Sequence, residues 1–309
     1  MPRSSRRLTS VAHAVICSVA VAATPLTGCV QSATPAAHAM APVRVSEFKV
    51  ERVGHGPPMI LIPGLLSGGE VWKSAIERYS DRYDMHVLTL AGFAGAPPIA
   101  ADSFLPAERN AIIRYIRDNH LEKPVLVGHS LGAFLAFWIA ATQPELVGPV
   151  VAVDGVPYFG ALNDTSMTPE RARPQAEQMR AMAATLTSDQ LAMQTAMALR
   201  RQSRDSANAH LGERWGRASD PATMGRAVAE IMTTDLRRQV AAIRTPVLLI
   251  ASGFGMTDSQ REITLASYSA QVSRVPNHRV MMAMNARHFV MLDDPAFLFA
   301  AIDQFLGGK

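Results

Sequence analysis

Cysteine is nearly absent from this chain of 309 residues, which contains only Cys17 and Cys29. Both lie near the N-terminus, so the remainder of the chain can form neither an internal disulfide nor a cysteine-based metal site. Charged residues are also few, at 18%. The formal charge is +4, and removing the three arginines of residues 1–28, which hold no acidic residue, lowers it to +1. Nucleic-acid-binding proteins concentrate positive charge on one face, and this balance does not favour a nucleic-acid partner.

The sequence also lacks cofactor motifs and long apolar runs. Gly92 and Gly95 do not have the spacing of a dinucleotide-binding fingerprint, and no phosphate-binding loop or metal-ligand motif is present in the sequence. We therefore expect a protein that uses no cofactor and no metal. The apolar run Val11–Ala23 is too short to span a bilayer comfortably, and no second apolar span follows it.

The N-terminus instead has the layout of an export signal. Three arginines precede Val11–Ala23, as in the positive and apolar regions of a signal peptide, which we place at residues 1–28. Leu26-Thr27-Gly28-Cys29 resembles a bacterial lipobox, which implies lipidation at Cys29 and an anchor in the lipid bilayer of the cell envelope, facing the periplasm or the exterior. The alternative is an ordinary signal cut after Ala39, which would release a soluble periplasmic or secreted protein.

After a Pro/Ala-rich tether at residues 29–44, short apolar runs alternate with helical patterns. Such alternation predicts an α/β fold, with a mostly parallel, doubly wound sheet between two layers of helices. The apolar runs expected to form the central strands include Met59–Ile62, Met85–Leu90, Val125–Val127, Val150–Val153, Val247–Ile250 and Val280–Met284.

Residues 157–244 break this rhythm, because they contain no strand-like run. They carry helix starts instead, at Thr168-Pro169, Thr187-Ser188 and Asp220-Pro221. We therefore predict a core formed by residues 45–156 and 245–309, with a helical lid at residues 157–244 inserted before the next-to-last strand.

Gly128-His129-Ser130-Leu131-Gly132 is the motif with the clearest chemistry. It follows the apolar run Val125–Val127 and precedes a helical apolar run without a breaker before Pro144. This order of strand, tight turn and helix is typical of a nucleophile elbow, in which a serine is held in a strained conformation. The helix and the strand leave little room for side chains at Gly128 and Gly132, which explains these glycines. Ser130 is therefore the predicted nucleophile.

A serine nucleophile needs a base, and donors for the negative charge that develops on its substrate. His288 follows the last predicted strand, at the edge of the sheet where the elbow lies, and is the predicted base. Of the two backbone N–H groups required, one comes from Leu131, directly after the nucleophile. The other is expected from Leu65, because Gly64 lets the loop after Met59–Ile62 turn in closely.

These motifs together resemble the lid-bearing serine hydrolases and esterases of the α/β-hydrolase fold, over nearly all of the chain from residue 45 onward. The resemblance is carried by Pro63-Gly64-Leu65, by the elbow, and by Arg287-His288-Phe289 followed by Asp294-Pro295. It implies a triad in the chain order serine, acid, histidine. One departure is Pro63, where many relatives have histidine, so the shape of that loop differs.

Two residues are candidates for the acid of the triad. Relatives usually place it three residues beyond a glycine in the loop after the next-to-last strand, but here that count from Gly253 reaches Met256. Asp258 lies two residues further, and it also suits the start of a helix with a Ser259–Glu262 capping box. Asp154 ends the strand before the lid, a position that some family members use, and we prefer it because its strand end holds it more firmly.

The resulting hypothesis is a serine hydrolase that cleaves a small ester or related acyl bond through an acyl-enzyme. Amide and carbon–carbon bond hydrolases of the family use similar residues and remain alternatives. Ser130 argues against resemblance to epoxide hydrolases and haloalkane dehalogenases, which need an aspartate as nucleophile. An alternative of another class is a non-catalytic, lipid-anchored binding protein on the same scaffold.

Overall fold

The computed structural model describes residues 47–162 and 164–307, so the predicted signal, the tether and Cys29 lie outside the described residues. A seven-stranded sheet has the order β1-β3-β2-β4-β5-β6-β7. Only β1 is antiparallel to its neighbour, and all other neighbouring strands are parallel, which confirms the predicted mostly parallel sheet. The strands are β1 (Phe48–Gly54), β2 (Pro58–Ile62), β3 (Asp84–Leu90), β4 (Val125–His129), β5 (Val150–Val153), β6 (Val247–Ser252) and β7 (His278–Ala283).

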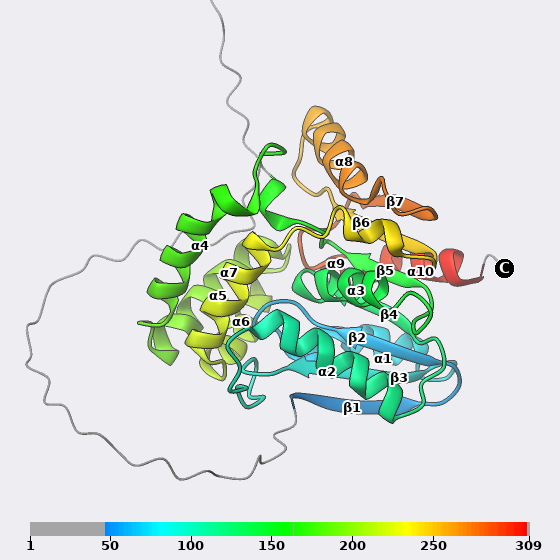
Figure 1. Cartoon of the computed structure of the whole chain (residues 1–309), viewed down its shortest axis with the longest axis horizontal. Helices are drawn as coiled ribbons and strands as arrows, with labels where there is room; N and C mark the ends of the chain where they lie inside the picture. The colour runs from blue at the N-terminus through cyan, green and yellow to red at the C-terminus, as the bar shows by residue number, and fades with distance from the viewer. Residues whose placement is uncertain (1–46, 163, 308–309) are drawn as a thin grey trace, which may run out of the picture. The chain divides into compact units, whose positions relative to one another are not determined.

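Helices cover both faces of this sheet (Figure 1). Side chains of successive strand residues alternate between the faces, so the continuous apolar runs are buried on both sides. In β2, Met59 and Leu61 join the cluster that includes Leu298 of the last helix, whereas Ile60 and Ile62 point to the opposite face. The core helices are α1 (Lys73–Tyr79), α2 (Phe104–Asp118), α3 (Leu131–Thr142), α8 (Asp258–Val272), α9 (Val290–Asp293) and α10 (Pro295–Gly307), and a 3₁₀ turn, η1 (Gly69–Trp72), precedes α1. No helix among the described residues is long and apolar enough to cross a membrane.

Between β5 and β6 the described residues form helices and no strand, as the sequence pattern predicts. We call residues 157–244 the insertion. Side chains of Thr168, Thr187 and Asp220 accept backbone N–H groups at the starts of three of its helices, which are the predicted starts. The insertion contains η2 (Phe159–Ala161), α4 (Pro169–Ala183), α5 (Ser188–Gln202), η3 (Ser206–Asn208), α6 (Ala209–Arg217), α7 (Pro221–Thr233) and η4 (Gln239–Ala242).

The contacts that join the insertion to the core include one at the start of α2 and one beside the predicted base. Glu230 of α7 accepts hydrogen bonds from the backbone N–H groups of Phe104 (2.8 Å) and Leu105 (2.6 Å), which are otherwise unpaired donors at the start of α2. Trp215 of α6 packs near Phe289, with ring centroids 6.4 Å apart. Phe289 directly follows the predicted base, so the insertion contacts the core beside the predicted site.

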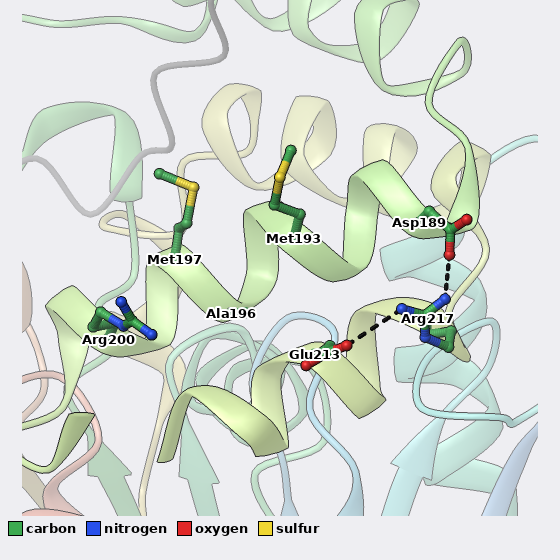
Figure 2. Close-up of a pocket in the computed structure, with 7 residues that line it drawn as sticks. All are labelled: Asp189, Met193, Ala196, Met197, Arg200, Glu213 and Arg217. Carbon is green, nitrogen blue, oxygen red and sulfur yellow. Dashed lines mark hydrogen bonds and ion pairs between the residues drawn. The ribbon is translucent and has the colours of Figure 1, made fainter. Parts of the chain in front are cut away.

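A pocket of about 290 Å³ lies between α5 and α6 (Figure 2). Arg217 spans it with ion pairs to Asp189 and Glu213, and Met193 and Met197 are exposed on α5. The pocket is lined by these two helices alone and by none of the predicted catalytic residues. It is therefore separate from the predicted active site.

Candidate active site

Ser130 occupies a sharp turn between β4 and α3, with φ 53° and ψ −116°. A positive φ is strained for a residue with a side chain, and such strain is common at functional sites. The flanking glycines are required by close packing. A Cβ at Gly128 would lie 2.3 Å from the carbonyl oxygen of Gly132, and one at Gly132 would lie 2.2 Å from that of Ile62. The local geometry is therefore that of the elbow predicted from the sequence.

Asp154 directly follows β5 and also has a positive φ, 47°. Its backbone N–H donates to Ile250 O at 2.7 Å, so the sheet fixes its position. Its carboxylate lies 2.7 Å from His288 Nδ1, measured at Oδ2. Because a carboxylate only accepts hydrogen bonds, Nδ1 carries the proton of the imidazole, which leaves Nε2 able to accept one.

Three further donors surround the Asp154 carboxylate. Ser252, the last residue of β6, donates from its backbone N–H to Oδ1 (2.9 Å) and from its hydroxyl to Oδ2 (2.9 Å). The hydroxyl of Tyr268 on α8 donates to Oδ1 at 3.0 Å. Burial and the nearby carboxylate raise the pKa of Tyr268 well above 10, so this hydroxyl keeps its proton. With His288, four hydrogen bonds satisfy the buried acid.

Asp258, the other candidate acid, has a different environment. It is the first residue of α8, its side chain is 93% exposed, and it pairs with Arg261 at 2.7 Å. The predicted capping box is wrong by two residues, because Thr257 and Gln260 form it. Thr257 has the extended backbone of an N-cap, whereas Ser259 is already helical. The structure therefore brings His288 to Asp154 and not to Asp258.

Ser130 follows the end of β4, and the residue before it, His129, contacts His288. The ring of His129 lies 4.6 Å from the ring of His288, measured between centroids, and its Nε2 lies 3.0 Å from the carbonyl oxygen of His288. Within the described residues, Ser130 Oγ has no hydrogen bond to His288 Nε2. Such catalytic hydrogen bonds commonly tighten only when substrate binds.

The loop after β2 passes close to the serine. A Cβ at Gly64 would lie 3.2 Å from Ser130 Cβ and 2.8 Å from His129 Nδ1, so a side chain at this position would require its neighbours to shift. Neither Leu65 N–H nor Leu131 N–H donates to another group of the described chain. Both predicted oxyanion donors are thus unpaired, and Leu131 N–H also lies at the positive end of the α3 dipole.

All three predicted triad residues are buried, with exposed fractions of 8% for Ser130, 7% for His288 and 3% for Asp154. Electrostatic interactions are stronger in such a setting than in water. The described residues hold no cluster of three or more His, Cys, Asp or Glu side chains that could bind a metal ion. The chemistry available at this edge is that of a hydroxyl, an imidazole and a carboxylate.

Three residues of this network, Ser252, Tyr268 and His129, were not predicted from the sequence. Ser252 could have been found, because it ends the strand beside β5 and the ends of parallel strands meet at one edge. Tyr268 lies on a helix 114 residues beyond Asp154, and no local pattern marks it. His129 occupies the variable position of the elbow motif, and the motif itself assigns no role to that side chain.

Known proteins resemble this chain in sequence and in fold. Residues 57–295 match the family model described as alpha/beta hydrolase fold. The chain belongs to the α/β-hydrolase fold family. This α/β-hydrolase enzyme is 26% identical over 265 residues to pimeloyl-acyl-carrier-protein methyl ester esterase of Aeromonas hydrophila, covering 84% of this chain and 98% of the relative.

Two further proteins are similar to this chain, one in sequence and one in structure. N-formylmaleamate deformylase of Pseudomonas putida is 26% identical over 277 residues, which is 82% of this chain and 90% of the relative. The crystal structure of a hydrolase from Pseudomonas aeruginosa superimposes with a TM-score of 0.67 at 17% identity, covering 84% of this chain and 93% of that one. At that identity the superposition supports the fold alone.

Proposed function

We propose that this enzyme is a serine hydrolase that cleaves small esters through an acyl-enzyme, with Ser130, His288 and Asp154 as its triad. The observation that carries the proposal is the 2.7 Å contact between His288 Nδ1 and the Asp154 carboxylate, next to a serine in a strained turn. A nucleophile, a base and a group that orients the base are the parts that acyl transfer requires.

The triad residues have distinct roles in this mechanism, and His288 acts as both base and acid. Ser130 Oγ attacks the carbonyl carbon of the ester while His288 Nε2 takes its proton. Asp154 holds the imidazole by Nδ1–H and stabilises the imidazolium that forms. The N–H groups of Leu65 and Leu131 bind the oxygen that becomes negative. The imidazolium then protonates the leaving alcohol, which leaves the acyl group on Ser130 Oγ. Water, deprotonated by the same imidazole, attacks the acyl carbon, the bond to Oγ breaks, and the imidazolium returns a proton to Oγ as the acid is released.

Esters of modest size with an apolar acyl or alcohol part are the proposed substrates. The relative from Aeromonas hydrophila is named for the hydrolysis of a methyl ester, which favours esters. Amides are the second candidate, because the relative from Pseudomonas putida is named as a deformylase of an N-formyl compound. The insertion would act as the lid over this site, since α6 contacts Phe289 beside the proposed base.

A fluorophosphonate probe tests the proposal, because only an activated serine reacts with it. We expect labelling of the wild-type protein and none of Ser130→Ala, together with a loss of about 10⁶ in kcat on nitrophenyl esters. A series of esters graded by acyl length, assayed beside matched anilides, then ranks the bond types. A wild-type protein that the probe leaves unlabelled would favour the binding protein without catalytic activity, and faster turnover of the anilides would favour an amidase.

We also propose that the enzyme is exported and lipid-anchored at Cys29, in the bacterial cell envelope. The support is the order of basic residues, apolar run and lipobox-like Leu26–Cys29 in the sequence. A lipidated Cys29 would carry several acyl chains, enough for stable anchoring. Feeding cells an alkyne-labelled fatty acid should label the wild type and not Cys29→Ser. A mature protein that begins at Met40 would instead indicate cleavage after Ala39 and a soluble product.

A further inference from the structure

His129 is a fully buried polar residue whose presence the elbow does not explain. It is the last residue of β4, is 1% exposed, and its ring packs against the ring of Phe289, which belongs to the apolar core cluster. An elbow needs glycines around its serine but has no steric need for an imidazole at this position. Burial of a polar ring is unfavourable unless hydrogen bonds compensate it, so its contacts indicate what it does.

The first contact fixes the chemical form of the ring. His129 Nε2 lies 3.0 Å from the main-chain carbonyl oxygen of His288. A carbonyl oxygen only accepts, so Nε2 carries a proton and donates it. Nδ1 has no hydrogen-bond partner among the described residues. Burial, and to a smaller extent the neighbouring His288, lower the pKa of His129 well below 6.5, so the ring is neutral with its proton on Nε2.

The second set of contacts places this ring among the parts of the site. Its centroid lies 4.6 Å from that of the His288 ring and 4.8 Å from that of Phe289. On its other side, a Cβ at Gly64 would lie 2.8 Å from His129 Nδ1. The His129 side chain therefore contacts both the loop that contains Gly64 and the loop that contains His288, and its backbone directly precedes Ser130.

The hydrogen bond from His129 Nε2–H and the contact with the Asp154 carboxylate hold His288 at two points. Asp154 holds the imidazole at Nδ1, and His129 holds the main chain of the same residue at its carbonyl oxygen. A ring held at one atom can still swing, whereas anchors on both side chain and main chain define its direction. The neutral state of His129 also matters, because a positive ring at this distance would oppose the imidazolium that His288 becomes during the reaction.

We propose that His129 is a positioning residue, whose Nε2–H fixes the main chain of His288 and thereby aims the catalytic imidazole at Ser130 Oγ. This inference rests on the proposed serine-hydrolase function. The residue does not touch the reacting atoms. It acts through His288, so its removal slows the chemical step more than it weakens substrate binding.

Two substitutions separate positioning from packing. His129→Phe keeps an aromatic ring of similar size in the apolar cluster but has no donor. His129→Gln has a smaller, flexible side chain, but its amide can donate to the carbonyl of His288. If the residue only filled space, Phe would be the better replacement. If its donor matters, Gln would be the better one. The measurements are kcat and KM on a nitrophenyl ester, the rate of fluorophosphonate labelling and the melting temperature.

We expect kcat and the labelling rate of His129→Phe to fall at least about tenfold, because small misplacements of a catalytic group are costly, with KM within about twofold of wild type. His129→Gln should recover most of that loss even if it melts at a lower temperature. A Phe variant as fast as or faster than the Gln variant would overturn the inference. If the wild type itself is not labelled, the proposed function fails instead, which is a separate result.

Nitrogen-15 spectra of the imidazole rings provide a second test that does not depend on activity. We expect His129 in the wild type to show the neutral Nε2–H form without titration between about pH 5 and 8. A His129 ring that gains a proton in this range, or that carries its proton on Nδ1, would contradict the assignment even if both variants were inactive through misfolding.

Discussion

A buried carboxylate at the carboxyl edge of the sheet, Asp154, contrasts with an exposed one between α5 and α6 of the insertion, Asp189. Asp154 is 3% exposed and accepts four hydrogen bonds, from His288, Ser252 and Tyr268. Asp189 and Arg217 are paired too, but their side chains are 80% and 55% exposed. Solvent and salt screen the exposed pair, whereas the buried network keeps one geometry.

Burial by itself does not produce such a network, as Glu108 of α2 shows. Its side chain is fully buried, but it accepts one hydrogen bond, from Ala91 N–H at 3.2 Å, and its Oε2 has no partner in the described residues. Burial raises the pKa of Glu108 to about 8. An acid that must orient a histidine therefore requires donors as well as a protected position.

The largest effect expected from breaking the buried network is that of Asp154→Asn. The imidazole of His288 would lose its partner and preferred tautomer, and kcat should fall by about 10⁴-fold. The matched control, Asp258→Asn, removes an exposed carboxylate and should change kcat by less than about tenfold. Steady-state kinetics on one nitrophenyl ester measures both, and the reverse order would identify Asp258 as the acid.

A smaller effect is expected when the network loses one donor. Tyr268→Phe removes the hydroxyl that donates to Asp154 Oδ1 and should lower kcat by about tenfold, the equivalent of one hydrogen bond to a charged group. Tyr158 offers a control, because its buried hydroxyl has no partner among the described residues. Tyr158→Phe should leave kcat unchanged, and equal losses in both variants would indicate a general effect on packing.

Because Glu108 is buried with one carboxyl oxygen unpaired, we expect the stability of the protein to depend on pH. The folded protein keeps the Glu108 proton up to about pH 8, whereas the unfolded chain releases it above about pH 4.5. Unfolding therefore releases a proton between these values, and the free energy of unfolding should decrease as pH rises through this window. Glu108→Gln should flatten this decrease.

Urea midpoints at three pH values across the window measure that difference. Glu262→Gln, at an exposed position of α8, serves as the control and should retain the wild-type slope. A Glu108→Gln variant with an unaltered slope would show that this carboxyl is ionised in the folded protein.

The smallest effect is expected at the exposed pair. Asp189→Asn removes the partner of Arg217 on the surface of the insertion, where Glu213 remains at 3.3 Å (Figure 2). We expect no measurable change in melting temperature or in kcat, because exposed ion pairs contribute little. A clear drop in melting temperature at low salt that disappears at high salt would show that the pair stabilises the insertion.

Much of the architecture follows from local patterns in the sequence. Continuous apolar runs such as Val125–Val127 form buried central strands, and Pro169 after Thr168 starts a helix where expected. Other details could not be read locally. Thr257 rather than Ser259 caps α8, and α6 has no side-chain cap hydrogen bond at its start.

Some features of the candidate site could likewise be predicted from local sequence patterns, and others could not. Gly128 and Gly132 mark the elbow around Ser130 because the clash that they avoid is built into any strand–turn–helix of this kind. The sequence favoured Asp154 over Asp258 only through its position at a strand end, since each residue follows a strand near the same edge of the sheet. Only the positions of β5, β6 and α8 in space bring Ser252 and Tyr268 to one carboxylate and leave the other in water.

The amino-acid sequence alone determined the α/β alternation, the helical insertion and the strained serine turn, because short-range sterics and the burial of apolar side chains set each of them. The tertiary structure decided which acid meets His288 and gave His129 its contacts. Those residues are separated by 134 and 159 positions, and hydrogen bonds over such separations exist only after the sheet has brought the ends of its strands together.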